Sequence, residues 1–298
     1  MSRVPDVPSP TRPRLDALAV RRTLREAGLR PRHRLSQNFL VDVDVLEGIL
    51  AEADPLPDER VLEIGPGLGV LTGGLLDARA RVTAVELDDR MVEQLQARFA
   101  DELGDGRLRL IAGDALDQDL VHLVEPPYDV VANLPYHVTS PTLHRLLGAP
   151  PRAHRLVLMV QREVAERIAS APGGMSYLSV FVQYHARVRI AFRVPREAFE
   201  PAPEVESAVI VLEPYDETDR LEPAMEDDLW RLVQAGFRER RKMLRNVLRR
   251  QLTGIAPERI ERALDEVGIT SDRRPQTLAV GEWIRLLEAL GPLPQPRS

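Results

Sequence analysis

Apolar and polar positions alternate along the chain in a pattern that predicts strands and helices in turn. Short apolar runs predict strands over 60–64, 81–86, 107–111, 128–132 and 155–160. Helical periodicity covers 88–100 and the segment after the fifth strand to about Ser170, and a helix over 15–27 precedes them all and ends at Gly28. This alternation is typical of a mostly parallel sheet with helices on both faces.

The pattern changes in the last third of the chain. Runs over 188–194 and 205–212 predict two more strands at an antiparallel end of the sheet. Beyond about Tyr215 the strand signal stops, and helices are predicted over 225–237, 240–251, 257–267 and 280–290. We therefore predict three regions: a flexible basic tail and helix over 1–34, a Rossmann-like α/β domain over 35–214, and a smaller all-helical domain over 215–298.

Charge is spread unevenly over the chain. The net charge is −6, yet residues 21–34 hold six arginines against one glutamate. Residues 231–250 hold seven arginines and one lysine, also against one glutamate. Two basic segments on an otherwise acidic chain are typical of a protein that meets a polyanion on one face. The alternative is that both are solvated surface.

Composition narrows the chemistry further. The 298 residues include no cysteine, which excludes disulfides, thiolate zinc sites and a cysteine nucleophile. No apolar run reaches the length of a membrane helix, and the N-terminal residues lack the apolar stretch of a signal peptide. The six histidines show no metal-ligand spacing. We therefore expect a cytoplasmic protein without a metal or a membrane partner.

A glycine-rich turn follows the first strand of the predicted sheet. Gly65, Gly67 and Gly69 have the G-x-G-x-G spacing, which is typical of S-adenosylmethionine enzymes. Such glycines let the backbone turn tightly against a ligand at a helix N-terminus. A dinucleotide fingerprint would need glycine where Val70 stands, which disfavours a nicotinamide dehydrogenase. A purely structural turn is the alternative.

Two acids end the next two predicted strands. Glu86 lies where a carboxylate can accept hydrogen bonds from both ribose hydroxyls of a nucleoside. Asp114 lies where a carboxylate can accept one from an adenine amino group. Either acid can instead cap a helix. Acids and glycines at successive strand ends are less expected by chance than any one of them.

Asn133, Leu134, Pro135 and Tyr136 follow the fourth predicted strand. A purine exocyclic amine is a poor nucleophile because its lone pair is delocalised into the ring. The Asn133 side-chain oxygen and the Leu134 carbonyl can accept hydrogen bonds from the two N–H groups of this amine and so direct its lone pair at a methyl donor. Pro135 fixes the backbone, and Tyr136 offers a ring for stacking. A plain strand-to-turn segment is the alternative.

Phe199 stands in a proline-stiffened segment, Phe199-Glu200-Pro201-Ala202-Pro203, before the last predicted strand. Its ring can cover the second face of a target base. On its own, the segment is better explained as a connector whose phenylalanine fills the core.

Taken together, these motifs resemble the rRNA adenine N6-dimethyltransferase family, and most closely its bacterial small-subunit branch. The resemblance covers about 21–290. It includes Ser36-Gln37-Asn38-Phe39-Leu40, the glycine-rich turn, Asn133 to Tyr136, Phe199 to Pro203, the segment 237–246 and Arg274-Pro275-Gln276. Ser36 departs from the glycine that is usual there and is also found in the large-subunit enzymes of macrolide resistance.

The resemblance implies a function and a set of site residues. Residues 35–214 would bind S-adenosylmethionine, and the chain would dimethylate two adjacent adenosines near the 3′ end of small-subunit (16S) rRNA during subunit assembly. The implied partner is the small ribosomal subunit, bound by a monomer. Donor contacts are expected at Gln37, Asn38, Leu40, Gly65, Gly67, Glu86, Asp114 and Asn133. The catalytic group would be Asn133, Leu134, Pro135, Tyr136 and Phe199.

Two other functions stay open at this point. One is methylation of large-subunit (23S) rRNA adenine, as in macrolide resistance. The other is a non-catalytic RNA-binding assembly factor that keeps the fold. The intact Asn133 to Tyr136 segment argues against loss of activity.

Overall fold

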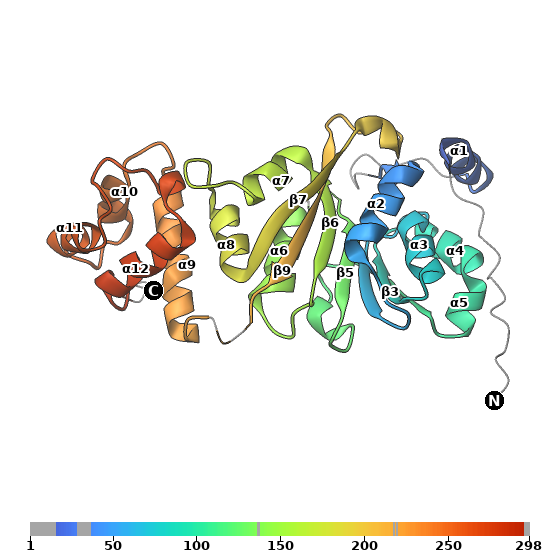
Figure 1. Ribbon diagram of the computed structural model, residues 1–298, viewed down its shortest axis with the longest axis horizontal. Helices are drawn as coiled ribbons and strands as arrows, with labels where there is room; N and C mark the ends of the chain where they lie inside the picture. The colour runs from blue at the N-terminus through green and yellow to red at the C-terminus, as the bar shows by residue number, and fades with distance from the viewer. Residues whose placement is uncertain (1–15, 29–36, 136–137, 217, 219, 295–298) are drawn as a thin grey trace. The chain divides into compact units, whose positions relative to one another are not determined.

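A computed structural model describes residues 16–28, 37–135, 138–216, 218 and 220–294 (Figure 1). The chain divides into two compact units: 1–165 with 189–214, and 166–188 with 215–298. The second unit thus includes a segment, 166–188, that the predicted boundary assigned to the α/β domain. The reason is hydrophobic packing, since Met175, Val180 and Tyr184 belong to the core of the C-terminal helices.

The first unit is built on a seven-stranded sheet of order β4-β3-β2-β5-β6-β9-β7. Its strands are β2 (Arg60–Ile64), β3 (Arg81–Glu86), β4 (Leu108–Ala112), β5 (Asp129–Asn133), β6 (Leu156–Gln161), β7 (Ala186–Val194) and β9 (Ser207–Pro214). The pairs β2–β3, β3–β4, β2–β5 and β5–β6 are parallel, whereas β6–β9 is antiparallel. The predicted α/β sheet with an antiparallel end is therefore confirmed.

The strand order fixes where a ligand can bind. Chain order runs outward from β2 through β3 to β4, and then resumes on the other side with β5 and β6. In open α/β sheets, ligands bind beyond the carboxyl ends of the strands at such a switch point. The candidate edge is thus the one where β2, β3 and β5 end.

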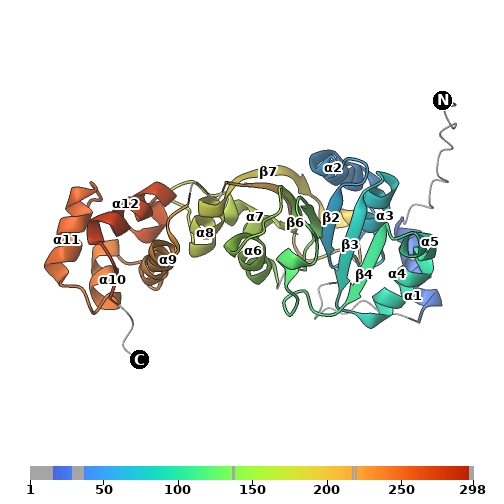
Figure 2. The ribbon, with the colours of Figure 1, turned by 90° about the horizontal axis from the view of Figure 1, so that it is seen from below.

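The first unit also holds helices. They are α1 (Ala17–Glu26), α2 (Val43–Ala53), α3 (Val70–Asp77), α4 (Asp89–Arg98), α5 (Ala100–Gly104), α6 (Thr139–Gly148) and α7 (Arg162–Ile168), the last of which extends into the second unit. α2 and α3 lie side by side against the strands (Figures 1 and 2). Sequence periodicity predicted one helix over 88–100, but the backbone breaks at Phe99 (φ −117°) and forms α4 and α5.

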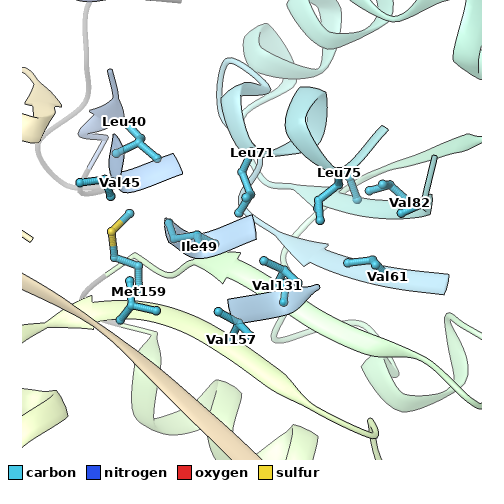
Figure 3. Close-up of a cluster of buried hydrophobic side chains, with 14 of the residues drawn as sticks. Leu40, Val45, Ile49, Val61, Leu71, Leu75, Val82, Val131, Val157 and Met159 are labelled. Carbon is cyan, nitrogen blue, oxygen red and sulfur yellow. The ribbon is translucent and has the colours of Figure 1, made fainter. Parts of the chain in front are cut away.

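Alternate strand residues make the core between the sheet and α2 and α3. Val61, Val131, Val157 and Met159 point to this face, where they meet helix residues such as Ile49 (Figure 3). Successive strand side chains point to opposite faces, so the neighbouring Leu62, Val130 and Leu158, all fully buried, serve the other face. Burial on both faces explains why these strands appear in the sequence as continuous apolar runs.

The second unit is mainly helical and also holds the first three residues of β7. Besides part of α7 it holds α8 (Tyr177–His185), α9 (Pro223–Phe237), α10 (Leu244–Gln251), α11 (Pro257–Glu266) and α12 (Val280–Leu290). Its core centres on Trp283, which is fully buried. An added Cβ on Gly236 would lie 2.5 Å from the Trp283 ring, so α9 needs glycine where α12 crosses it.

α10 corrects one expectation. The sequence predicted a helix over 240–251, which would hold Arg241, Lys242, Arg245 and Arg249 together. The helix begins only at Leu244, because the Leu244 N–H donates to the Arg273 carbonyl (2.8 Å) and the preceding residues form turns. Arg241 and Lys242 therefore lie outside the helix.

Candidate active site

The glycine-rich turn links β2 to α3 in a conformation that other residues rarely adopt. Gly65, Gly67 and Gly69 have φ values of +71°, +58° and +76°. An added Cβ on Gly67 would stand 3.2 Å from the Phe39 ring, and one on Gly69 would stand 2.4 Å from the Phe99 ring. Left-handed backbone and close neighbours together explain the glycine spacing.

Glu86 ends β3 and joins two backbone segments. One carboxylate oxygen accepts from the Gly67 N–H (2.9 Å) and the other from the Asp88 N–H (2.9 Å). Burial raises the pKa of Glu86, and these backbone hydrogen bonds oppose that rise. Each oxygen retains a second lone pair, so the fixed carboxylate can also accept from a pair of hydroxyls.

Asp114 lies beyond the end of β4. One oxygen accepts from the Leu116 N–H (2.8 Å), which forms a turn rather than the helix N-cap that was the alternative. The adjoining Gly113 N–H donates to the Glu86 carbonyl (2.8 Å), so the ends of β3 and β4 are tied together. The second Asp114 oxygen has no hydrogen bond within the described part of the chain and can accept one from a ligand.

The segment after β5 contacts the glycine-rich turn. Asn133 is the half-buried last residue of β5, and the buried Leu134 donates its N–H to the Met159 carbonyl of β6 (3.0 Å). The Pro135 ring lies in van der Waals range of the position that a Cβ on Gly65 would take, at 3.6 Å. The predicted target segment and the predicted donor segment thus meet. Tyr136 lies outside the described residues.

A second, two-stranded sheet brings together two motifs that are far apart in the chain. β1 (Phe39–Leu40) pairs antiparallel with β8 (Phe199–Glu200), with Leu40 opposite Phe199. Phe199 is 3% exposed and belongs to the hydrophobic core cluster on the α2 side of the sheet. It also lines the pocket described next, so its ring is both core and wall.

One pocket joins these segments at the carboxyl edge of the sheet. Every predicted site residue except Tyr136 lines it: Gln37, Asn38, Leu40, Gly65, Gly67, Glu86, Asp114, Asn133, Leu134, Pro135 and Phe199. Polar groups therefore sit in a wall that is otherwise largely apolar, which is the usual character of a cofactor site.

Sequence reasoning missed Glu63, which also lines the pocket. It is 1% exposed, and its carboxyl accepts a hydrogen bond from the Thr72 hydroxyl of α3 (2.7 Å). Burial raises the pKa of Glu63 to about 8. The signal was present, since Glu63 lies inside an apolar strand where a charged residue is unusual.

Neither a membrane segment nor a metal cluster appears in the part of the chain that the structure describes. None of the helices there has the length and apolar character needed to cross a bilayer. Nor do the His, Asp and Glu side chains of these residues form a group of three that could hold a metal ion.

Comparison with known sequences gives long matches. The profile of the ribosomal RNA adenine dimethylase family matches residues 28–290. Ribosomal RNA small subunit methyltransferase A of Geobacter sulfurreducens is 41% identical over 273 residues, which are 90% of this chain and 98% of that protein. The protein of the same name from Sphingopyxis alaskensis is 42% identical over 278 residues, covering 91% and 98%.

Solved structures give the same fold. A dimethyladenosine transferase from Plasmodium falciparum superposes with a TM-score of 0.72 at 26% identity, covering 84% of this chain and 96% of that one. The 23S rRNA methyltransferase ErmE superposes with a TM-score of 0.67 at 30% identity, covering 85% and 99%.

The sheet, its switch point and the glycine-rich pocket define the class as a Rossmann-like, S-adenosylmethionine-dependent methyltransferase. The family match over most of the chain then makes the assignment specific: this chain belongs to the ribosomal RNA adenine dimethylase family. The resemblance drawn from the motifs is confirmed, and with it the enzyme class and the methyl donor.

Proposed function

We propose that this protein transfers methyl groups from S-adenosylmethionine to N6 of two adjacent adenosines near the 3′ end of small-subunit (16S) rRNA. The observation that carries the proposal is the 41–42% identity, over about nine tenths of the chain, to proteins named for the small subunit. The named 23S enzyme is 30% identical. The small ribosomal subunit is accordingly the proposed partner, met in the cytoplasm by a monomer.

The donor fits the pocket at the glycine-rich turn. The left-handed glycines leave room that a Cβ would fill, and the Glu86 carboxylate is held in place to accept ribose hydroxyls. Asp114 would accept from the adenine amino group, while Gln37, Asn38 and Leu40 form the facing wall. When bound, S-adenosylmethionine supplies an electrophilic methyl group.

The target amine is oriented by residues that follow β5. In the first transfer, the Asn133 side-chain oxygen and the Leu134 carbonyl accept hydrogen bonds from its two N–H groups, which frees the lone pair from the ring and stabilises the positive charge that develops on nitrogen. The nitrogen loses one proton for each methyl group that it gains, so one N–H remains for the second transfer. The Leu134 backbone is held by its bond to β6, so the carbonyl needs little reorganisation. Phe199 offers a ring face to the base.

The test is methylation of purified subunits. Small subunits that lack dimethyladenosine and large subunits are incubated separately with enzyme and donor, and rRNA fragments are analysed by mass spectrometry. We expect two adjacent dimethyladenosines in the small-subunit rRNA and no change in the large-subunit rRNA. Modification of the large subunit alone would favour the macrolide-resistance type of activity, and no modification would favour the assembly-factor alternative.

A further inference from the structure

Asp88 touches the donor pocket without lining it. It is the N-cap residue of α4 and is 3% exposed. Its carboxylate accepts a hydrogen bond from the Gln37 side-chain amide (2.9 Å), which approaches from a segment far away in the sequence. Arg90 donates to the same carboxylate through Nε (2.9 Å) and through its terminal nitrogen (2.5 Å). The carboxylate is thus the centre of a three-residue network.

This network reaches two walls of the pocket. Gln37 lines the pocket just before β1, and β1 in turn holds β8 with its Phe199. On the other side, the Asp88 N–H donates to Glu86, whose second oxygen holds the Gly67 N–H. Residue 88 therefore links the Gln37 wall to the wall of the glycine-rich turn.

The charge on Asp88 strengthens the link. Arg90, and after it Gln37, lower the pKa of Asp88 to about 2, so the carboxylate is ionised at any physiological pH. A hydrogen bond from a neutral amide to an ionised acceptor is stronger than one between neutral groups. Gln37 is accordingly held by a strong, partly buried contact.

We infer that Asp88 is a positioning residue for donor binding, which acts by holding Gln37, and with it residues 37–40, against the pocket. The inference rests on the proposed function in one respect only, that the pocket takes S-adenosylmethionine. Asp88 does not contact the donor; Gln37 transmits its effect.

A double-mutant cycle on the full chain tests this inference. Asp88→Asn keeps a good N-cap and nearly the same volume but removes the charge, and Gln37→Met removes the amide donor. S-adenosylmethionine affinity is measured by calorimetry without RNA. We expect each single variant to bind about tenfold more weakly, and the double variant to bind no more weakly than either, because all three lose the same contact.

Asp105→Asn is the matched control. Asp105 accepts from the backbone N–H (3.0 Å) and Nε (2.9 Å) of Arg107, which repeats the Asp-x-Arg arrangement of Asp88 and Arg90 away from the pocket lining. The affinity of the Asp105→Asn variant for S-adenosylmethionine should stay within about twofold of the wild type. Thermal unfolding of all variants shows whether they fold.

Two kinetic readings complete the test. If Asp88 only positions Gln37, then Asp88→Asn raises the KM for the donor while kcat at saturating donor is retained. Folded Asp88→Asn protein with wild-type donor affinity would overturn the inference, as would single effects that multiply in the double variant. Since the titration contains no RNA, a wrong ribosomal target would show only in the subunit assay.

Discussion

The polar groups that line the pocket of the first unit differ from the cations of the second unit in burial and in pairing. Around the pocket the polar groups are buried or half-buried, and some are fixed by hydrogen bonds, as Glu86 is by two backbone N–H groups. In the second unit Arg238, Arg241, Lys242 and Arg274 are exposed, and none pairs with a carboxylate of the described chain. Buried, fixed groups act through geometry, whereas exposed cations act through screened charge. Substitutions in the two regions should therefore differ in both size and salt dependence.

The largest effect is expected at Asn133. Asn133→Ala removes the acceptor that orients the target amine, so turnover should fall on the order of 10²-fold or more while RNA affinity changes little. Single-turnover methylation of small subunits, with subunit binding measured in parallel, checks this. Near-normal turnover would assign the orientation of the amine to other groups.

Glu63, in the wall of the pocket, makes the free energy of unfolding of the protein depend on pH. Its pKa in the folded protein is about 8, well above the ordinary glutamate value of 4.5, because the carboxyl is buried. Between these values the unfolded chain has lost the proton and the folded chain has kept it, so the free energy of unfolding falls as pH rises. Glu63→Gln does not titrate, and its stability relative to the wild type should rise by up to about 1.4 kcal/mol per pH unit.

Urea unfolding of both proteins between pH 5 and pH 9 measures the difference. The free energy of unfolding of Glu63→Gln should rise relative to that of the wild type up to about pH 8, and the difference should then level off. Glu197→Gln, on an exposed glutamate, is the control and should run parallel to the wild type. If Glu63→Gln also runs parallel, the buried carboxyl is not protonated in the folded state.

Phe199 separates a stacking role from a packing role. Phe199→Ala removes a ring that lines the pocket. If a base stacks on this ring, the loss should lower kcat/KM for methylation by an amount equivalent to roughly 1–3 kcal/mol. Phe199→Tyr keeps the ring face and should keep much of the activity. Equal loss in both variants, read from kcat/KM on small subunits, would make Phe199 core alone, as its place in the hydrophobic cluster also allows.

How far the sequence predicted these regions depends on the range of the interactions. Gly65, Glu86 and Asn133 could be placed together because parallel strands end at one edge, so local patterns sufficed. The pairing of Leu40 with Phe199 could not be seen, because each strand has two residues and no local turn joins them. The resemblance supplied those residues instead. Residues 166–188 and the start of α10 were misjudged because contacts from distant segments set them.

The smallest change is expected in the basic segment 231–250, whose cations the structure divides into two groups. Arg245 and Arg249 on α10 share Glu261, at 4.0 Å for Arg245, and Arg250 pairs with Glu239 (2.8 Å). Arg241 and Lys242 precede the helix and have no such carboxylate among the described residues. A cation already paired on its own chain gains less from a phosphate than an unpaired one does.

The two groups can be compared in matched double variants. Arg241→Gln with Lys242→Gln should weaken subunit binding and flatten the slope of log affinity against log salt by roughly 0.7–0.9 per phosphate contact. Arg245→Gln with Arg249→Gln removes the same charge but should flatten the slope less, because Glu261 offsets those arginines. Donor affinity should be unchanged in both, since none of these four residues lines the pocket and phosphate contacts only position the RNA. Equal slopes in the two variants would mean that pairing with Glu261 does not restrain the helix arginines. A slope unaltered from the wild type in both variants would leave the whole segment 231–250 as solvated surface and move the RNA contacts toward residues 21–34.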